Sequence, residues 1–266
     1  MISLSHKTTL KKLQKMKGQE KIVMITAYDA LFASIFDPYV DMILVGDSLN
    51  MSFAGKPDTI SATIDQMIYH TQAVCSKTEK SFVLFDMPFG TYSDKATALK
   101  HAVRVYQETG ADAIKLEGGR EKVEIIRHLS DNAIAVFGHI GLKPQSARSE
   151  GGYSIKGKSE EEKREIIENA LALEEAGVVA MIIEGVKPDV AKEVTARLSI
   201  PTIGIGAGVE CDGQVLVWSD MLGFFEDFMP KFVKQYLDGG KLVKEAVQQY
   251  ASEVKSGAFP DAEHSY

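Results

Sequence analysis

The chain has 266 residues, of which 45% are hydrophobic, and 37 acidic residues outnumber 30 basic ones. This length suits one large domain, since single-domain α/β barrels typically have about 250 residues. The basic residues are scattered, which argues against a nucleic-acid or membrane-surface partner and favours a small molecule. No apolar run approaches the roughly 18 residues of a membrane span, and no signal pattern opens the chain. Cys75 and Cys211 lie far apart, as expected for a protein of the reducing cytoplasm.

The predicted elements alternate between strands and helices. An amphipathic helix is expected first, at about 7–17, where it should close one end of the domain. Eight short apolar runs follow, with helical segments between most of them. We predict strands at 22–26, 42–46, 82–86, 113–117, 134–138, 178–184, 202–205 and 215–218. This alternation favours a closed parallel barrel, the (β/α)8 or TIM barrel, over an open sheet.

Cap residues mark two of the helices between the strands. One helix should begin at Ser93 as N-cap and end near Gly110, and a second should open with a capping box at Ser159 and close at Gly177.

The end of the chain differs from the rest because it contains no strand candidate after 218. A helical tail is expected at about 222–256, in two amphipathic stretches, 224–237 and 241–254. Two roles are open for this tail: it covers the barrel, or it builds a subunit interface. We expect residues 1–266 to form one domain.

Four predicted strands end at or just before an acidic residue. Burying a carboxylate at the end of an apolar strand costs free energy unless a cation pairs with it. These residues are Asp47, Asp86, Glu117 and Glu184. Barrel enzymes carry their catalytic residues at the carboxyl ends of the strands, so these acids should line one site. Three carboxylates, from Asp47, Asp86 and Glu117, suit Mg²⁺ or Mn²⁺ better than zinc. The alternative is that each acid only caps the helix that follows it.

Lys115 lies two residues before Glu117, so both side chains should point into the barrel. Three roles are open for a buried lysine beside acids: an ion-pair partner, an anchor for a substrate carboxylate, or a Schiff-base nucleophile. We favour the anchor.

Two more residues are candidates for proton transfer or ligand contact. His139 follows the fifth predicted strand and is flanked by glycines, which let the backbone approach a ligand. Glu184 has no lysine beside it, so it is free to accept a proton if a metal occupies the other three acids. Its alternative roles are an N-cap and a pair with an arginine. The glycine-rich segment 204–208 is expected to line the same mouth.

Several motifs, found in order between about 21 and 237, together resemble the ketopantoate hydroxymethyltransferase family. They are VGDS at 45–48, FDMPF at 85–89, KLEGG at 115–119, GHIGL at 138–142 with PQ at 144–145, IEG at 183–185, IPTIGIGAG at 200–208 and CDGQVLV at 211–217. The resemblance implies a (β/α)8 barrel of the phosphoenolpyruvate/pyruvate-type group. It also implies a cytoplasmic protein that assembles as a homo-oligomer, usually a decamer.

The activity implied by the resemblance is the transfer of a hydroxymethyl group from 5,10-methylenetetrahydrofolate to 3-methyl-2-oxobutanoate. The product is 2-dehydropantoate (ketopantoate), on the way to pantothenate and coenzyme A, and the reaction runs through an enolate stabilised by one Mg²⁺ per subunit. The matching metal-site residues are Asp47, Asp86 and Glu117, binding directly or through water. The matching oxo-acid contacts are Asp47, Ser48, Asp86 and Lys115. Glu184 matches the proton acceptor, and His139 matches a histidine of the site.

Three other hypotheses compete with this interpretation. The first is a Mg²⁺-dependent carbon–carbon lyase or phosphonate mutase on the same barrel, and the second is an aldolase that forms a Schiff base on Lys115. The third is a catalytically silent barrel that binds a metabolite or a protein partner.

Overall fold

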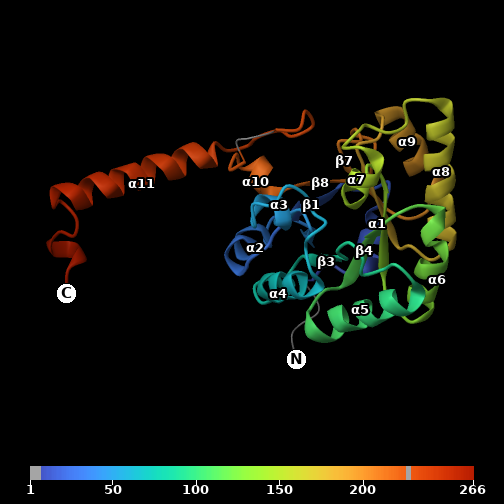
Figure 1. Ribbon diagram of the computed structural model, residues 1–266, viewed down its shortest axis with the longest axis horizontal. Helices are drawn as coiled ribbons and strands as arrows, with labels where there is room; N and C mark the ends of the chain where they lie inside the picture. Colours follow the sequence, from blue (N-terminus) through green and yellow to red (C-terminus); the bar gives the residue numbers. More distant parts are fainter. Residues whose placement is uncertain (1–6, 226–228) are drawn as a thin grey trace. The chain divides into compact units, whose positions relative to one another are not determined.

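The computed structural model describes residues 7–225 and 229–266, and the chain forms two compact units, Met1–Val217 and Trp218–Tyr266. The first unit is a closed barrel of parallel strands that neighbour one another in chain order (Figure 1). The strands are β1 Ile22–Thr26, β2 Met42–Val45, β3 Phe82–Asp86, β4 Ala113–Glu117, β5 Val136–Gly141, β6 Ala180–Glu184, β7 Thr202–Ile205 and β8 Gly213–Leu216. The predicted barrel fold is confirmed.

The bounds of two strands differ from the prediction. One of these strands carries His139, and the other completes the barrel beside β1. β5 runs to Gly141 rather than ending at 138, because His139 and its flanking glycines remain in the strand although they interrupt the apolar run. β8 begins at Gly213, two residues earlier than expected, and Trp218 belongs to helix α10 (Trp218–Met221) instead.

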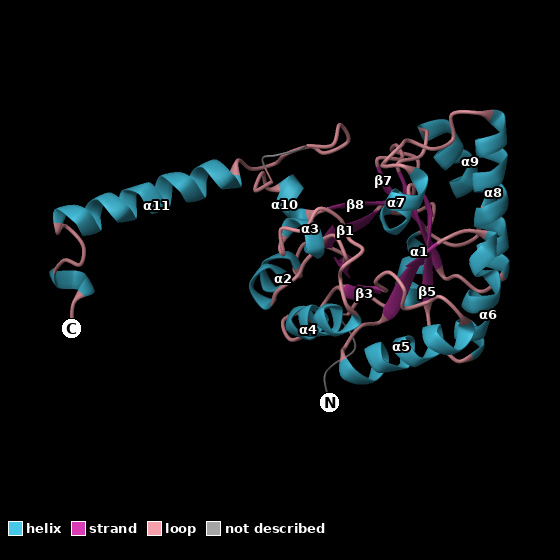
Figure 2. Ribbon diagram, viewed as in Figure 1, coloured by secondary structure: helices cyan, strands magenta, loops and turns pink. Residues whose placement is uncertain are grey.

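Helices surround the strands in the first unit, as Figure 2 shows in cyan and magenta. They are α1 Leu10–Met16, α2 Ala30–Phe36, α3 Leu49–Ser52, α4 Ile64–Cys75, α5 Lys95–Glu108, α6 Val123–Asp131, α7 Ala147–Glu150, α8 Glu160–Glu175 and α9 Pro188–Arg197. The connection from β7 to β8, residues 206–212, contains no helix. It turns at Gly206 and Gly208, whose φ angles of 62° and 90° suit glycine.

The outer face of strand β1 is partly exposed beside this short connection. Val23 on β1 pairs with Gln214 on β8, and both side chains point outward, because their neighbours Ile22 and Val215 belong to the core. Val23 remains 49% exposed, which is unusual for a barrel strand.

Helix α1 closes the amino-terminal end of the barrel, as expected. Its N-cap is Thr9, whose hydroxyl accepts a hydrogen bond from Lys12 N. The buried side chains of Leu13 and Met16 belong to the same core as the inward-facing residues of the strands. An apolar plug at this end leaves the opposite end for chemistry.

The predicted helix caps hold with two differences. Ser159 caps α8 and accepts from Glu162 N, and Gly177 follows the helix with a φ of 105°. The second half of the predicted capping box is wrong, because the Glu162 side chain accepts from Lys158 N rather than from Ser159 N. α5 begins one residue later than expected, since Asp94 rather than Ser93 accepts from Thr97 N.

The second unit contains α10 and the long helix α11 (Gly239–Ser256), which covers the predicted 241–254 stretch. The helix predicted at 224–237 is wrong for the part that is described, while 226–228 lie outside the described residues. Pro230 has no N–H to offer a helix, and the segment instead folds back, with Tyr236 N bonded to Met221 O. The expectation of one domain stays a prediction.

None of the helices within residues 7–225 and 229–266 is both long and apolar enough to cross a membrane. Cys75 and Cys211 are free thiols.

Candidate functional site

Strand pairing brings the predicted site residues face to face. Asp86 on β3 pairs with Lys115 on β4, and Glu117 on β4 pairs with His139 on β5. Two positions earlier on these strands are Leu84, Ala113 and Phe137, which belong to the apolar core. Each inward row therefore changes from apolar to charged toward the carboxyl end of the barrel, where enzymes of this architecture have their sites.

Lys115 is the cation around which two of the acids gather. Its Nζ lies 2.6 Å from Asp86 Oδ1 and 3.9 Å from Glu117 Oε1, and all three side chains are almost fully buried. Burial opposes the charge on Lys115, but the acids outweigh it and raise its pKa. A lysine held protonated in this way is a poor amine nucleophile, so the Schiff-base hypothesis loses support.

Asp47 follows β2 and joins the same cluster. Its backbone N donates to Asp86 Oδ2 at 3.2 Å, and its own carboxylate accepts from Gln145 Nε2 at 2.9 Å. Ser48, the next residue, lies with its hydroxyl 2.8 Å from that of Tyr28. The structure therefore brings Asp47, Asp86, Lys115 and Glu117 together.

His139 and Glu184 occupy the adjoining side of the barrel. His139 Nδ1 is 3.6 Å from Glu117 Oε1, and its Nε2 is 3.3 Å from Glu184 Oε2. Burial, followed by the charge of Lys115, lowers the pKa of His139, so the imidazole is neutral. Glu184 ends β6 and is 20% exposed, the most accessible carboxylate of the group. It can therefore meet a ligand that enters from the mouth.

The alternative roles for these acids do not fit the structure. The helices and turns that follow them have other N-caps, namely Ser48 for α3, Asp94 for α5, Gly119 for the turn Arg120–Lys122 and Lys187 for α9. Glu184 contacts His139 rather than an arginine.

Two residues of the site were missed as functional candidates. Gln145, in the turn Pro144–Ser146 after β5, bonds to Asp47 and through its backbone N to Glu117 Oε2. The hydroxyl of Tyr92 donates to Gln145 Oε1. Pro144 and Gln145 are among the motif residues that carry the family resemblance, but no role was predicted for Gln145, and Tyr92 offered no signal.

The charge balance of the site favours a cation. Three carboxylates surround one ammonium group, so two negative charges would be unbalanced if all three acids were ionised without a bound cation. Burial, then Asp86, raises the pKa of Asp47 to about 8, and burial raises that of Glu117 well above its usual value. Glu117 Oε1 is a buried oxygen without a hydrogen-bond partner. A divalent ion fits this charge and this donor chemistry.

The side chains are not arranged as a complete set of ligands. In the part of the chain that the structure describes, no three His, Cys, Asp or Glu residues are placed to hold one ion jointly. The predicted three-carboxylate metal site thus stays a proposal.

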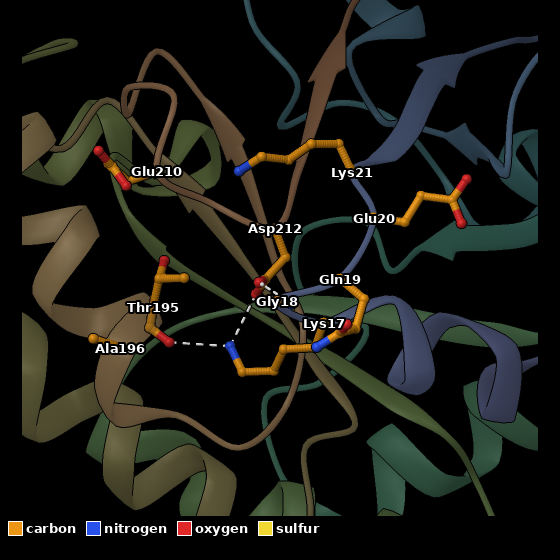
Figure 3. Close-up of a pocket in the computed structure, with 9 residues that line it drawn as sticks. All are labelled: Lys17, Gly18, Gln19, Glu20, Lys21, Thr195, Ala196, Glu210 and Asp212. Carbon is orange, nitrogen blue, oxygen red and sulfur yellow. Dashed lines mark hydrogen bonds and ion pairs between the residues drawn. The ribbon is translucent and has the colours of Figure 1, made fainter.

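A separate cavity of about 450 Å³ lies at the other end of the barrel (Figure 3). Its lining residues precede β1, β7 and β8, which places it at the amino ends of the strands. Lys17 Nζ bonds to Asp212 Oδ2 at 2.9 Å and Thr195 O at 3.0 Å, and Lys21 Nζ bonds to Cys211 O at 2.6 Å. These bonds hold α1 and the β7–β8 connection to the barrel, so we interpret this end as structural.

Fold and site together define a (β/α)8-barrel enzyme with a buried acid, lysine and histidine cluster at the carboxyl ends of its strands. The family model for ketopantoate hydroxymethyltransferase matches residues 7–262. The chain belongs to this family of one-carbon transferases.

Curated relatives agree with this assignment, and solved structures share the fold. The chain is 62% identical over 258 residues to 3-methyl-2-oxobutanoate hydroxymethyltransferase of a Nitratiruptor species, covering 97% of this chain and 98% of the relative. Phosphonopyruvate hydrolase in complex with oxalate and Mg²⁺ shares the fold, with a TM-score of 0.62, 12% identity and coverage of 97% and 93%. So does 2,3-dimethylmalate lyase of the PEP mutase/isocitrate lyase superfamily, with a TM-score of 0.59, 15% identity and coverage of 97% and 92%.

Proposed function

We propose that this enzyme transfers a hydroxymethyl group from 5,10-methylenetetrahydrofolate to 3-methyl-2-oxobutanoate, giving 2-dehydropantoate, with Mg²⁺ as cofactor. The proposal rests on one observation: Asp47, Asp86 and Glu117 converge around Lys115. Glu184 lies beside this cluster, in contact with His139. The structurally similar hydrolase was solved with Mg²⁺ and oxalate, a small anion like the head of a 2-oxo acid. That likeness supports the choice of ligand.

Asp47, Asp86 and Glu117 would hold the metal, directly or through water. Bound Mg²⁺ supplies a Lewis acid that stabilises negative charge on the oxygens of a 2-oxo acid. Lys115 and Ser48, with Asp47 and Asp86, would contact the oxo acid. Lys115 is suited to this because its protonated amine can share a hydrogen with a substrate carboxylate while it stays bonded to Asp86.

Glu184 would remove the proton from C3 of the oxo acid. It is the carboxylate of the group with the most solvent access, and none of its oxygens is tied to Lys115. C3 forms a bond to the one-carbon unit, and both C–N bonds between this carbon and the donor break. Over the whole reaction water supplies the hydroxyl of the product, and the C3 proton and the remaining proton of water end on the two nitrogens of tetrahydrofolate. Neutral His139, at 3.3 Å, would keep the Glu184 side chain in place.

The direct test is product formation from the oxo acid and the folate donor. We expect turnover with Mg²⁺ and a loss of about a hundredfold or more in excess chelator, measured by chromatographic detection of 2-dehydropantoate, since the metal contributes several kcal/mol to enolate formation. Activity that persists in chelator, with borohydride trapping of substrate on Lys115, would establish the aldolase hypothesis instead. Cleavage of a dicarboxylic acid without folate-dependent turnover would favour a lyase.

We further propose that the chain acts in the cytoplasm and forms a homo-oligomer, with a decamer as the expected assembly. In α11 the residues Val243, Val247, Tyr250 and Val254 repeat at intervals of four, three and four, so they form one stripe. They are between 45% and 59% exposed, and Gly239 is the only residue of the helix that is buried. An 18-residue helix with an apolar stripe that its own unit does not cover needs a partner in water. We propose that this partner is a second copy rather than the barrel of the same chain.

A charge in this stripe tests the assembly. Val247→Asp is expected to lower the molar mass measured by light scattering, because an unpaired carboxylate would be buried in the interface. Ser252→Asp, on the opposite face of α11, is the matched control and should leave the mass unchanged. An unchanged mass for Val247→Asp would remove α11 from the interface.

A further inference from the structure

Gln145 is the most highly connected neutral residue of the site. It is 5% exposed, and its backbone N donates to Glu117 Oε2 at 3.1 Å. Its side-chain Nε2 donates both to Asp47 Oδ2 and to Met87 O, each at 2.9 Å. One residue thus contacts two acids that arise from different strands, 98 and 28 positions away in the chain.

Tyr92 fixes which way the amide of Gln145 points. Its hydroxyl donates to Gln145 Oε1 and lies 3.4 Å from the backbone N of Glu117. An amide oxygen only accepts, so Tyr92 must donate its single hydrogen to it. If the amide flipped, its oxygen would face the carboxylate of Asp47 and the carbonyl of Met87, both acceptors.

A neutral hydrogen-bond donor at this position can orient the carboxylates without cancelling their charge. Asp47, Asp86 and Glu117 repel one another when they are ionised, and an extra lysine or arginine would cancel the charge that attracts a divalent ion. The amide and the backbone N–H of Gln145 restrain the carboxylates of Asp47 and Glu117 without neutralising them.

We propose that Gln145 is a positioning residue, which together with Tyr92 presets the carboxylates of Asp47 and Glu117 for a divalent cation. This inference rests on the proposed function, because it assumes that these acids bind the metal. It adds two residues that act through the acids and need not touch the substrate.

The test is the Mg²⁺ affinity of Gln145→Met and Tyr92→Phe, measured by calorimetry on the full-length protein without substrate. Methionine matches glutamine in length and removes all three side-chain hydrogen bonds, so we expect a dissociation constant about tenfold higher, equivalent to about 1.4 kcal/mol. Tyr92→Phe leaves the amide in place but frees its orientation, so we expect a change of about threefold in the same direction. Thr71→Val, which removes a buried hydroxyl bonded to Met67 O in α4, is the control. It should lower the melting temperature and leave the Mg²⁺ affinity unchanged.

A double mutant separates positioning from general damage. If Gln145 acts through Asp47, adding Gln145→Met to Asp47→Asn should change the Mg²⁺ affinity by less than about twofold. Unchanged affinity in folded Gln145→Met, or in Tyr92→Phe if the first variant does not fold, overturns the inference. The Mg²⁺ affinity of the wild-type protein distinguishes the two possible failures. If the wild-type protein binds no Mg²⁺, both the proposed function and this inference are refuted. If it binds Mg²⁺ and the variants bind equally well, only this inference is refuted.

Discussion

Glu184→Gln should abolish exchange of the C3 proton of 3-methyl-2-oxobutanoate for deuterium while the protein still binds Mg²⁺ and the oxo acid. General-base catalysis typically contributes about 10²–10⁴-fold, so we expect a loss of about a thousandfold in exchange and in turnover. Glutamine has nearly the shape of glutamate, and Glu184 lies outside the acids that contact Lys115. Binding should therefore survive. The measurement is proton NMR in deuterated buffer, with calorimetry for Mg²⁺.

A nearby glutamate provides the control for this substitution. Glu150 is 27% exposed and pairs with Lys156 and Lys143 after β5, away from the buried acids. Glu150→Gln removes one comparable negative charge and should change the exchange rate by less than about threefold, as for other partly exposed ion pairs. Rapid exchange in Glu184→Gln would take the base role away from Glu184. Full cellular function with that variant would instead favour a catalytically silent barrel.

The local sequence was enough to locate most of the barrel and its acids. An apolar run that stops at a carboxylate identified β3 and β4 to the residue, and the two-residue period of a strand placed Lys115 beside Glu117 on the inner face. These features are properties of single strands. They can be read without knowing what lies opposite.

The parts that failed depend on the neighbours of a residue in space. β8 contains Gly213 and Gln214, which do not resemble a strand until β1 and β7 pair with them on either side. The amide of Gln145 meets Asp47, and the hydroxyl of Tyr92 meets Gln145, only after three strands have been brought into register. The residue pattern within a single segment cannot predict a hydrogen bond between side chains of different segments.

Asp86→Asn is expected to weaken Mg²⁺ binding by at least about tenfold and also to destabilise the fold. Asp86 is bonded to Lys115 Nζ at 2.6 Å and accepts from Asp47 N at 3.2 Å, in a site that is almost fully buried. Asparagine keeps the size of the side chain but loses its charge, so Lys115 remains buried without its ion-pair partner, with Glu117 at 3.9 Å and Asp47 as the remaining acids of the cluster. Breaking a buried pair typically costs about 3–5 kcal/mol, and we expect the lower end of this range because Glu117 remains. Denaturant unfolding of the metal-free protein measures this loss.

The double variant Asp86→Asn/Lys115→Met separates the two effects. Removing both partners of a buried ion pair is often nearly neutral, so the free energy of unfolding should recover much of what Asp86→Asn lost. Mg²⁺ affinity should not recover, because the carboxylate proposed to bind the ion is still absent. If calorimetry gave wild-type Mg²⁺ affinity for either variant, Asp86 would be only the structural partner of Lys115, and the metal would have to be held by other groups.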